Sequence, residues 1–467
     1  MIINLSIGEI AKAVKGEIIN GSDNNLTIKN IAVDSRKVLP DSLFIALKGE
    51  KADGHDFILK AVDSGALGVI AQKNHVKQID LQTINAPVIA VEDTLAALLN
   101  TAKYYKSLFK KLNITAGITG SVGKTTTKEF VYSVLSERFK TQKSSENHNT
   151  DTGMSFTLFE LEEDTEAIIL EMGMSGFGEI KRLSETANPD AAVITTIGTS
   201  HISNLGSREG IKKAKFEILD GMDYNANIIL NGDEPLLYSE KNKTGRKEYF
   251  FGINNKDADF TAGNIEFDYD NGYSFFTVNN DNFKFKIPAS GTHNIYNALP
   301  AFITGKIYGL SNDEIQAGFN NFQNVKMRQN IYDFNGITII DDCYNASLES
   351  VKAALETLSK IKKINNNKKI AVLSDVLESG DFAEEIHRKI GESVVENKTD
   401  KVFAYGENSE ITCRTIKKHN AECVYFDDKS EIAKALYKEA KKDDVILFKA
   451  SRGMALETVI EDFKKLF

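Results

Sequence analysis

The sequence predicts an α/β protein of three domains built on mostly parallel sheets. Short apolar runs rich in β-branched residues alternate with amphipathic stretches of helical period, which is the pattern of parallel strands joined by crossover helices. The chain has 467 residues, and at roughly 150 residues per domain this length corresponds to about three domains. Polar residues also follow the expected strands repeatedly, as they do where open sheets bind ligands.

The composition excludes several classes of protein. Lys and Arg number 57 and Asp and Glu 66, a net charge of −9, whereas nucleic-acid binding needs a clustered basic excess. No apolar run approaches the ~18 residues of a membrane span, and the N-terminal segment lacks the pattern of a signal peptide. The cysteines form no CxxC pair; they are Cys343, Cys413 and Cys423. We expect no nucleic acid partner, no membrane insertion and a reduced, cytoplasmic location.

Residues 1–84 are expected to form a small N-terminal α/β domain. It holds the segment VDSRKVLPDSLFIALKG and then a helical stretch over 57–64. The chain has only 6 prolines, and Pro87 marks the expected start of the second domain. That domain opens with a predicted helix over 94–109.

Residues 85–325 are expected to form the central domain, with helices on both faces of its sheet. Apolar runs predict four strands, at 114–118, 167–170, 191–197 and 227–230. Between about 265 and 287, two aromatic-rich runs flank the turn-rich NNDN and predict a β-hairpin added antiparallel to the sheet. A helix over 294–309 closes the domain.

Residues 326–467 are expected to form a C-terminal, Rossmann-like domain. Strands are predicted at 337–340, 369–373, 401–405 and 445–449, and helices over 348–360, over 430–441 and from about 454 onward. The polar residues that follow strands in this domain are Asp341, Asp342, Asp375, Ser451 and Arg452. The central domain has a similar polar edge, so we expect a site between the two domains.

The segment TGSVGKTT has the context of a phosphate-binding loop, because it follows a predicted strand and opens a predicted helix. Its glycines let backbone N–H groups turn toward phosphate oxygens, and Lys124 and Thr125 supply a positive charge and a hydroxyl for Mg²⁺. The strict GxxxxGK[ST] spacing fails, because Ile118 stands at the first glycine position. The alternative is a strand-to-helix turn without a ligand. The central sheet is thus expected to be of the P-loop type, with candidate nucleotide-binding residues Thr119, Gly120, Ser121, Val122, Gly123, Lys124, Thr125 and Thr126.

Three further positions have both a functional and an ordinary explanation. Glu171 ends an apolar strand, where a second carboxylate for Mg²⁺ would stand opposite the phosphate loop, but a loop-capping carboxylate is equally expected there. A lone histidine such as His201 is more often a hydrogen-bonded loop residue. Lys215, in GIKKAKFEIL, is by itself more often a solvated lysine.

His293 opens a predicted helix, and Asn294 and Asn297 place two amides on one face of it. Amides at a helix start often only cap the helix. The functional alternative is that they contact the edge of a purine while the histidine ring packs on the base.

Together, ten segments resemble the Mur ligases, the ATP-dependent amide ligases of peptidoglycan synthesis. In chain order they are VDSRKVLPDSLFIALKGEKADGHDF, GITGSVGKTTTKEF, NHN at 147–149, LEMGMSGFGEI, TTIGTSHISNLGSREGIKKAKFEI, SGTHNIYNALPA, KMRQN, DDCYNASLESV, VLSDVLESG and LFKASRGMALE. The resemblance covers nearly the whole chain. DDCYNAS, VLSDVLESG and SRG are similar to the member that adds D-alanyl-D-alanine, and the DNPR-like motif of the tripeptide-forming member is missing.

The resemblance implies roles for residues at matching positions. The implied catalytic residues are Lys124, Glu171, His201, Lys215 and Arg328, and Arg328 would also reach the ATP phosphates. One Mg²⁺ would be held by Thr125 and Glu171, and a second by His201 and a carbamylated Lys215. Adenine would contact His293, Asn294 and Asn297, and the ribose Asp342. The precursor would contact Ser35, Arg36, Lys48 and Asn149, and the incoming dipeptide Ser451 and Arg452.

The implied reaction joins D-alanyl-D-alanine to UDP-N-acetylmuramoyl-tripeptide through an acyl phosphate, with release of ADP and phosphate. The N-terminal domain would bind the UDP precursor, the central domain ATP and the C-terminal domain the dipeptide, in a monomer. Related alternatives are the tripeptide-forming ligase and a ligase similar to folylpolyglutamate synthase. From another class, a nucleotide-binding scaffold or switch would use the same fold without ligation.

Overall fold

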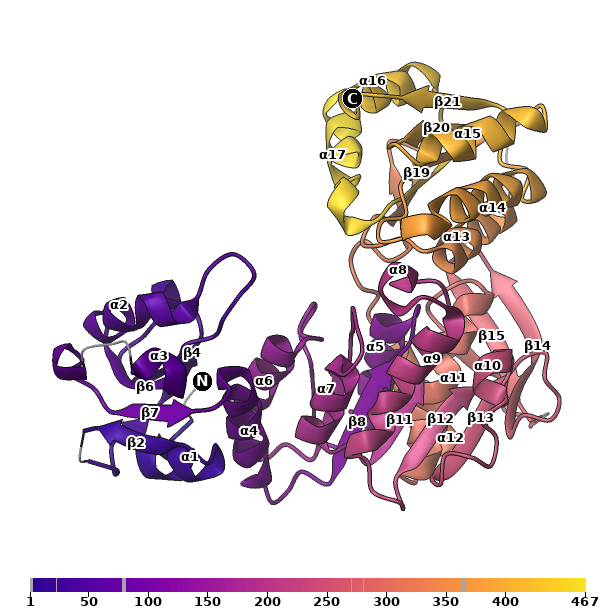
Figure 1. Ribbon diagram of the computed structural model, residues 1–467. Helices are drawn as coiled ribbons and strands as arrows, with labels where there is room; N and C mark the ends of the chain where they lie inside the picture. The colour runs from indigo at the N-terminus through magenta and orange to yellow at the C-terminus, as the bar shows by residue number, and fades with distance from the viewer. Residues whose placement is uncertain (1–2, 22, 78–80, 270, 280, 363–366) are drawn as a thin grey trace.

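The computed structural model describes residues 3–21, 23–77, 81–269, 271–279, 281–362 and 367–467. Three lobes follow one another along the chain, each around a sheet of its own (Figure 1). The predicted fold class is confirmed, because all three sheets are mostly parallel and are joined by helices. None of the helices in these ranges is long and apolar enough to cross a membrane.

The N-terminal lobe is built on a five-stranded sheet of order β2-β7-β6-β5-β4, with a separate β1-β3 pair. The strands are β1 (Leu5–Ser6), β2 (Glu17–Asn20), β3 (Thr27–Ile28), β4 (Asn30–Ala32), β5 (Ser42–Ile45), β6 (Ala66–Gln72) and β7 (Val88–Val91). The α-helices are α1 (Ile7–Ala13), α2 (Ile58–Asp63) and α3 (Lys73–Val76), and the 3₁₀ turns are η1 (Ser35–Lys37), η2 (Gly54–Phe57) and η3 (Leu81–Thr83).

The structure corrects the expected start of the second domain at residue 85. Strand β7 follows Pro87, yet it pairs in parallel with β6 and antiparallel with β2, inside the first sheet. Pro87 stands just before the strand, where a missing N–H costs no ladder bond. The N-terminal sheet therefore extends to Val91, and the change of lobe follows at α4 (Thr94–Ser107).

The central lobe is built on a nine-stranded sheet of order β16-β15-β14-β13-β12-β11-β8-β10-β9. Its strands are β8 (Ile114–Thr119), β9 (Thr141–Lys143), β10 (Ala167–Glu171), β11 (Ala191–Ile194), β12 (Asn227–Asn231), β13 (Lys247–Gly252), β14 (Phe260–Asp268), β15 (Tyr273–Val278) and β16 (Phe285–Ile287). The predicted hairpin is confirmed, since β15 pairs antiparallel with β16. Strands β9, β13 and β14 were not predicted.

Helices cover both faces of the central sheet because its strands are apolar on both sides. Along β10, Ile168 and Leu170 pack into one buried cluster and Ile169 into the other. The helices after α4 are α5 (Lys124–Leu135), α6 (Asp151–Phe159), α7 (Glu179–Ala187), α8 (Ile202–Leu205), α9 (Arg208–Phe216), α10 (Pro235–Tyr238), α11 (Thr292–Ile307) and α12 (Asn312–Asn320), with the 3₁₀ turn η4 (Glu217–Gly221).

Strand β11 ends three residues earlier than the predicted 191–197. The backbone N–H of Thr195 donates to Thr119 O at 3.0 Å, and the N–H of Ser121 donates to Thr196 O at 3.0 Å. Residues 195 and 196 therefore leave the strand ladder and bind the phosphate loop instead. This contact fixes the loop against the edge of the sheet where the site lies.

The C-terminal lobe is built on a six-stranded sheet of order β17-β18-β22-β19-β20-β21. Its strands are β17 (Asn330–Phe334), β18 (Ile337–Asp342), β19 (Lys369–Ser374), β20 (Lys401–Tyr405), β21 (Cys423–Phe426) and β22 (Val445–Lys449). The helices are α13 (Leu348–Lys360), α14 (Ala383–Glu396), α15 (Ser409–Lys418), α16 (Ser430–Glu439) and α17 (Glu457–Lys465), with 3₁₀ turns η5 (Gly380–Phe382) and η6 (Arg452–Met454). The edge strands β17 and β21 were not predicted. In Figure 1 the C-terminal lobe lies above α8 of the central lobe.

Candidate active site

The phosphate loop joins β8 to α5 through two glycines that no other residue could replace without strain. Gly123 has φ +86°, and a Cβ there would lie 2.3 Å from Asn297 Oδ1. Gly120 has φ +147°, and a Cβ there would lie 1.8 Å from Thr195 Oγ1. Each glycine thus combines an unusual backbone angle with the close approach of a neighbouring segment.

The start of α5 is open to an anion. No side chain caps this helix, so the N–H groups of its first turn have no partner within the helix and carry the positive end of its dipole. Beside it, the hydroxyls of Thr119 and Ser121 are buried without a hydrogen-bond partner among the described residues. Unsatisfied polar groups of this kind indicate a site for a polar ligand.

Lys124, Thr125 and Glu171 lie together at this edge of the sheet. Lys124 Nζ donates to Gly120 O at 2.9 Å, and the Thr125 hydroxyl donates to Glu171 Oε2 at 2.8 Å. The other carboxylate oxygen of Glu171 accepts from Asn149 Nδ2 at 3.1 Å. Three predicted site residues, Thr125, Glu171 and Asn149, are therefore linked by hydrogen bonds beside the phosphate loop.

Positive charge surrounds the Glu171 carboxylate. Burial raises the pKa of Glu171, but the charges of Lys124, Arg328 and Lys128, with the Thr125 hydroxyl, outweigh burial and lower this pKa overall. Burial also lowers the pKa of Lys124, an effect that Glu171 opposes and Arg328 reinforces. Arg328 comes from the C-terminal lobe, so both lobes contribute charge to this site.

Lys215 is buried on α9, although a surface position was the more common expectation. Lys215 is only 3% exposed, and its amine has no hydrogen-bond or ion-pair partner among the described residues. Burial and the charge of Lys124 both lower the pKa of Lys215 well below its ordinary value. Both effects favour the neutral, nucleophilic amine form of this side chain.

His201 stands at the boundary between the two lobes with a strained backbone. Its φ is +61°, in the left-handed region that non-glycine residues seldom occupy. Its Nδ1 lies 2.5 Å from Oε2 of Glu378, which comes from the C-terminal lobe. Burial lowers the pKa of His201; Glu378 opposes this shift, and the charges of Lys124 and Lys215 add to it. His201 is thus near both lysines.

Arg328 and Asp342 already have partners within the C-terminal lobe. The Arg328 guanidinium lies 3.9 Å from the centre of the Tyr344 ring, and the Tyr344 hydroxyl donates to Asn147 of the central lobe. Lys449 Nζ lies 2.9 Å from Asp342 Oδ2. The expected ribose contact of Asp342 would therefore share this carboxylate with Lys449.

The three residues expected near adenine surround the start of α11. Asn294 Nδ2 donates to Ser290 O at 2.8 Å, as a helix-start amide often does. Asn297 Nδ2 donates to Asn294 Oδ1 at 3.4 Å, and Asn297 packs on Gly123 of the phosphate loop. His293 lies next to Gln329, at the junction with the C-terminal lobe. The two amides are close together, and one of them supports the phosphate loop directly.

A cavity of about 230 Å³ lies between the central and C-terminal lobes. It collects residues from both: Thr199, Ser200, His201, Tyr344, Asn345, Ala346, Ser347, Val376, Leu377, Glu378, Ser451, Arg452 and Gly453. The predicted residues His201, Ser451 and Arg452 thus share one cavity. Ser451 Oγ accepts from Leu377 N at 2.9 Å, and Arg452 pairs with Glu457 at 2.9 Å.

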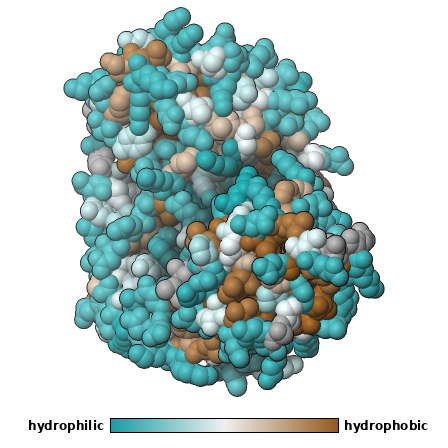
Figure 2. Space-filling model, turned by 90° about the vertical axis from the view of Figure 1, so that its left-hand side faces the viewer, coloured by the Kyte–Doolittle hydropathy of each residue, from teal (hydrophilic) through white to brown (hydrophobic). Residues whose placement is uncertain are grey.

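The predicted precursor contacts Ser35, Arg36 and Lys48 lie on the N-terminal lobe. Ser35 is buried in η1, whereas Arg36 is exposed and pairs with Asp34 at 2.8 Å. Lys48 forms an isolated β-bridge with Asp53. Figure 2 faces this lobe and shows an apolar area on a largely hydrophilic surface; exposed large apolar side chains of the lobe are Leu39, Phe57 and Leu59.

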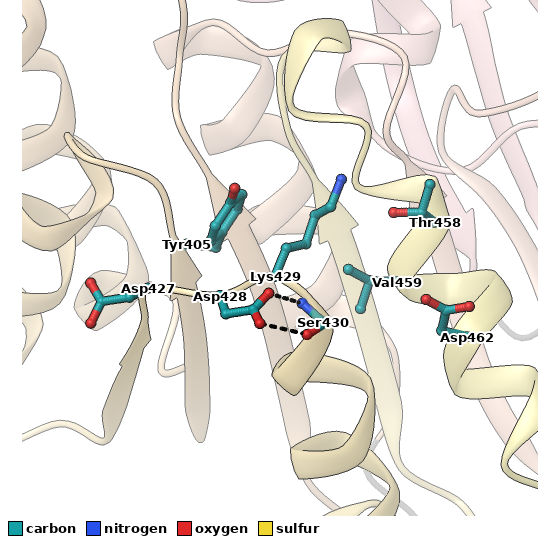
Figure 3. Close-up of a pocket in the computed structure, with 8 residues that line it drawn as sticks. All are labelled: Tyr405, Asp427, Asp428, Lys429, Ser430, Thr458, Val459 and Asp462. Atoms are coloured by element: carbon teal, nitrogen blue, oxygen red, sulfur yellow. Dashed lines mark hydrogen bonds between the residues drawn. The ribbon is translucent and has the colours of Figure 1, made fainter.

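Two other groups of polar residues lie outside the cavity between the lobes. Asp53, His55 and His75 have metal-ligand spacing, but the imidazole rings stack at 4.0 Å and 14°, and one ion cannot lie in both ring planes. His55 Nε2 also accepts from Gln72 N at 3.0 Å. The second group lines a pocket of about 340 Å³ in the C-terminal lobe (Figure 3), in which Lys429 Nζ is bound by the carbonyl of Met454 at 3.0 Å.

Sequence reasoning did not identify Glu378, Glu349 or Tyr344 as site residues. All three lie in segments of C-terminal motifs, VLSDVLESG and DDCYNASLESV, for which no residue-level role was expected. Glu349 Oε2 accepts from the Thr199 hydroxyl at 3.2 Å. Their position shortly after predicted strands could have indicated a functional role. That they contact the central lobe follows only from the way the two lobes pack together.

Replacement of Gly123 by alanine should weaken nucleotide binding at least tenfold. The added Cβ meets Asn297 Oδ1 at 2.3 Å on a backbone with φ +86°, so the loop must change shape. Gly176→Ala is the matched control, because its Cβ would have an ordinary 3.4 Å contact with Glu179. Titration calorimetry with ATP measures the effect; equal affinities of the two variants would contradict it.

The stability of the protein should fall in acid partly through His293. Burial lowers the pKa of His293 to about 4, with Gln329 opposing and Lys449 adding to the shift. An unfolded histidine has a pKa of about 6.5, so between these values the unfolded chain binds more protons. The stabilisation is complete above pH ~6.5 and is lost as the pH falls toward 4. The melting temperature of wild type should therefore fall more steeply than that of His293→Gln; parallel curves would refute this.

Comparisons with known proteins match nearly the whole length of the chain. Residues 118–305 match the Mur ligase middle domain, residues 327–452 the Mur ligase glutamate ligase domain, and residues 27–106 the catalytic domain of the Mur ligase family. The UDP-N-acetylmuramoyl-tripeptide–D-alanyl-D-alanine ligase of Bacillus subtilis strain 168 is 38% identical over 466 residues, with 98% of each chain covered.

Solved structures agree with this match. The crystal structure of MurF from Acinetobacter baumannii has a TM-score of 0.89 and 27% identity and covers 99% of each chain. The MurF ligase of Thermotoga maritima, crystallised in complex with ADP, has a TM-score of 0.81 and 28% identity and covers 93% of this chain and 97% of its own. Sequence, fold and site geometry together show that the chain belongs to the Mur ligase family.

Proposed function

We propose that this protein is an ATP-dependent ligase that joins D-alanyl-D-alanine to UDP-N-acetylmuramoyl-tripeptide in peptidoglycan synthesis. The products are ADP, phosphate and the UDP-N-acetylmuramoyl-pentapeptide. The observation that carries the proposal is the cavity between two lobes, where His201 meets Ser451 and Arg452 beside the phosphate loop. A relative with this activity in its name is 38% identical over nearly the full length.

The first step activates a carboxylate, which is a poor electrophile. An oxygen of the tripeptide carboxylate attacks the γ-phosphorus of ATP, the bond from that phosphorus to ADP breaks, and an acyl phosphate forms. Lys124 and Arg328 neutralise the charge of the transferring group, and the open amides at the start of α5 bind its oxygens. Alignment and charge, rather than covalent participation of the protein, account for this step.

The second step makes the amide bond. The dipeptide amine attacks the acyl carbon, the carbon–nitrogen bond forms, the carbon–oxygen bond to phosphate breaks, and the amine releases a proton to solvent. Water would destroy the acyl phosphate, so the amine must arrive in an enclosed space. The cavity between the lobes provides that space, with Ser451 and Arg452 as the residues for the dipeptide.

The residues around Glu171 fit a Mg²⁺ ion. The Thr125 hydroxyl and the Glu171 carboxylate are hard oxygen donors 2.8 Å apart, and unpartnered hydroxyls of Thr119 and Ser121 lie in the same loop. Thr125 and Glu171 would hold the ion, which when bound would supply positive charge to the phosphate oxygens. Asn149 orients the second oxygen of Glu171, and it would lie near the precursor.

Lys215 fits a carbamylated residue at a second Mg²⁺ site with His201. A neutral lysine amine adds to CO₂, a proton leaves, and the product carries anionic oxygens of the kind that Mg²⁺ prefers. The buried, unpaired amine and the lowered pKa of Lys215 both favour that reaction. The negative charge of the carbamate would be stabilised by Lys124, whose positive charge already acts on Lys215.

The remaining residues extend the site toward its two larger substrates. Adenine would contact His293, Asn294 and Asn297. The ribose would contact Asp342, whose carboxylate would then be shared between the ribose and Lys449. Ser35, Arg36 and Lys48 would bind the uridine end of the precursor. We further propose that the protein acts in the cytoplasm, as a monomer.

A phosphate-release assay with a panel of acceptors tests the function. With ATP and UDP-N-acetylmuramoyl-tripeptide present, D-alanyl-D-alanine should release phosphate at a rate at least a hundredfold above that with single amino acids. Release with a single amino acid and a shorter precursor would instead identify a tripeptide-forming ligase, and release with a folate and glutamate a folylpolyglutamate synthase. Phosphate release that needs neither precursor nor acceptor would identify a nucleotide-binding switch.

Lys215→Ala should lower kcat by about a hundredfold or more, because one charged contact to the reacting group is worth ~3 kcal/mol. Short carboxylic acids should restore part of the activity by replacing the carbamate. Lys213→Ala, an exposed lysine on the same helix, is the matched control. ¹³C-labelled bicarbonate should give a carbamate NMR signal in wild type that is missing from Lys215→Ala. Full activity of Lys215→Ala without added acid would disprove the assignment.

A further inference from the structure

Glu378 is an unusual residue for the loop in which it lies. It follows β19 in the C-terminal lobe, and its φ of +58° places a non-glycine residue in the left-handed region. It meets His201, which has φ +61° and belongs to the other lobe. Two strained residues in contact across a lobe boundary indicate a functional rather than a packing role.

The Glu378 carboxylate is only partly satisfied by the protein. Its Oε2 lies 2.5 Å from His201 Nδ1, and among the described residues its Oε1 has no hydrogen-bond partner. The side chain is 58% exposed and lines the cavity between the lobes. One carboxylate oxygen is therefore available to a donor that enters the cavity.

The charged side chains of the cavity match a zwitterion. The lining has one carboxylate, Glu378, one guanidinium, Arg452, and the imidazole of His201. Ser200, the neighbour of His201 in the cavity lining, donates to Ser121 O of the phosphate loop at 3.4 Å, so the Glu378–His201 pair lies beside the phosphate loop. Arg452 instead contacts Met327 and Glu457 of its own lobe. An amine held at Glu378 would thus point toward the acyl phosphate, while a carboxylate would remain with Arg452.

We propose that Glu378 binds the ammonium group of the incoming dipeptide and so selects a free amine as the acceptor. The inference rests on the proposed function and assigns a specificity-determining contact within it. A charge-assisted hydrogen bond from the ammonium to Glu378 Oε1 holds the nitrogen on the side of the phosphate loop. The ammonium loses a proton to solvent before the amine attacks.

The test compares two ligands of the full-length protein that differ only in the amine. D-alanyl-D-alanine has it, and N-propionyl-D-alanine lacks it. Wild type, loaded with ATP and precursor, should have a KM for the dipeptide at least tenfold below the inhibition constant of the analogue. In Glu378→Gln the KM for the dipeptide should rise at least tenfold, while the inhibition constant of the analogue and the KM values for ATP and precursor stay within twofold.

Two controls separate this role from its alternatives. Acyl phosphate formed without dipeptide and trapped by hydroxylamine should be equal in wild type and Glu378→Gln; its loss in the variant would show that Glu378 acts through His201 and would overturn the proposal. Glu349→Gln removes a different carboxylate that joins the lobes, through Thr199, and should keep the preference for the dipeptide over the analogue.

The outcomes also separate this inference from the proposed function. An unchanged dipeptide KM in Glu378→Gln would overturn the role of Glu378 and leave the ligase activity in place. Failure of the wild type to release phosphate with D-alanyl-D-alanine would overturn the proposed function itself. A melting temperature of Glu378→Gln equal to that of wild type establishes that the variant is folded.

Discussion

The site depends on a local excess of buried positive charge that the protein alone does not balance. Glu171 faces Lys124 and Arg328, beside a Lys128 that is itself paired with Glu129 at 3.3 Å, and Lys215 has no acidic partner among the described residues. A buried charge without a partner costs free energy, and the lowered pKa values of Lys124 and Lys215 reflect that cost. A triphosphate and a carbamate would both supply the missing negative charge. The net charge of −9 is no obstacle, because local groups set the potential of a site.

The same constraint explains why the site lies between lobes. The central sheet supplies the phosphate loop and Glu171, but Arg328 and Glu378 come from the C-terminal lobe. Contacts across the boundary hold the two parts in register, for example the hydrogen bond from Thr199 to Glu349 at 3.2 Å. The strained φ values of His201 and Glu378 occur at this boundary; such strain persists only where surrounding contacts impose it.

The sequence predicts the local features of this molecule better than its long-range ones. Helix α13 and strands β20 and β22 have the predicted bounds, because their apolar patterns are regular. Strand β11 ends early because Thr195 pairs with the phosphate loop, a contact between segments more than 70 residues apart. The burial of Lys215 and its lack of a partner likewise depend on contacts between α9 and segments distant in the sequence. The short edge strands β9, β17 and β21 are only partly buried and carry little pattern.

The two chemical tasks, phosphoryl transfer and choice of the acceptor, fall to different parts of the molecule. Phosphoryl transfer needs the same charges whatever the acceptor is, so most of the groups proposed to perform it lie on the rigid ends of central strands and on α5, and the C-terminal lobe adds Arg328. The choice of acceptor needs groups that contact only the incoming amine. On our proposal they lie in loops of the C-terminal lobe, after β19 and β22, where Glu378, Ser451 and Arg452 line one cavity. Changes in these loops would alter the acceptor while Lys124 and Glu171, which do not line that cavity, stay in place. The two sets of residues meet at His201 and at Tyr344, whose ring lies against Arg328.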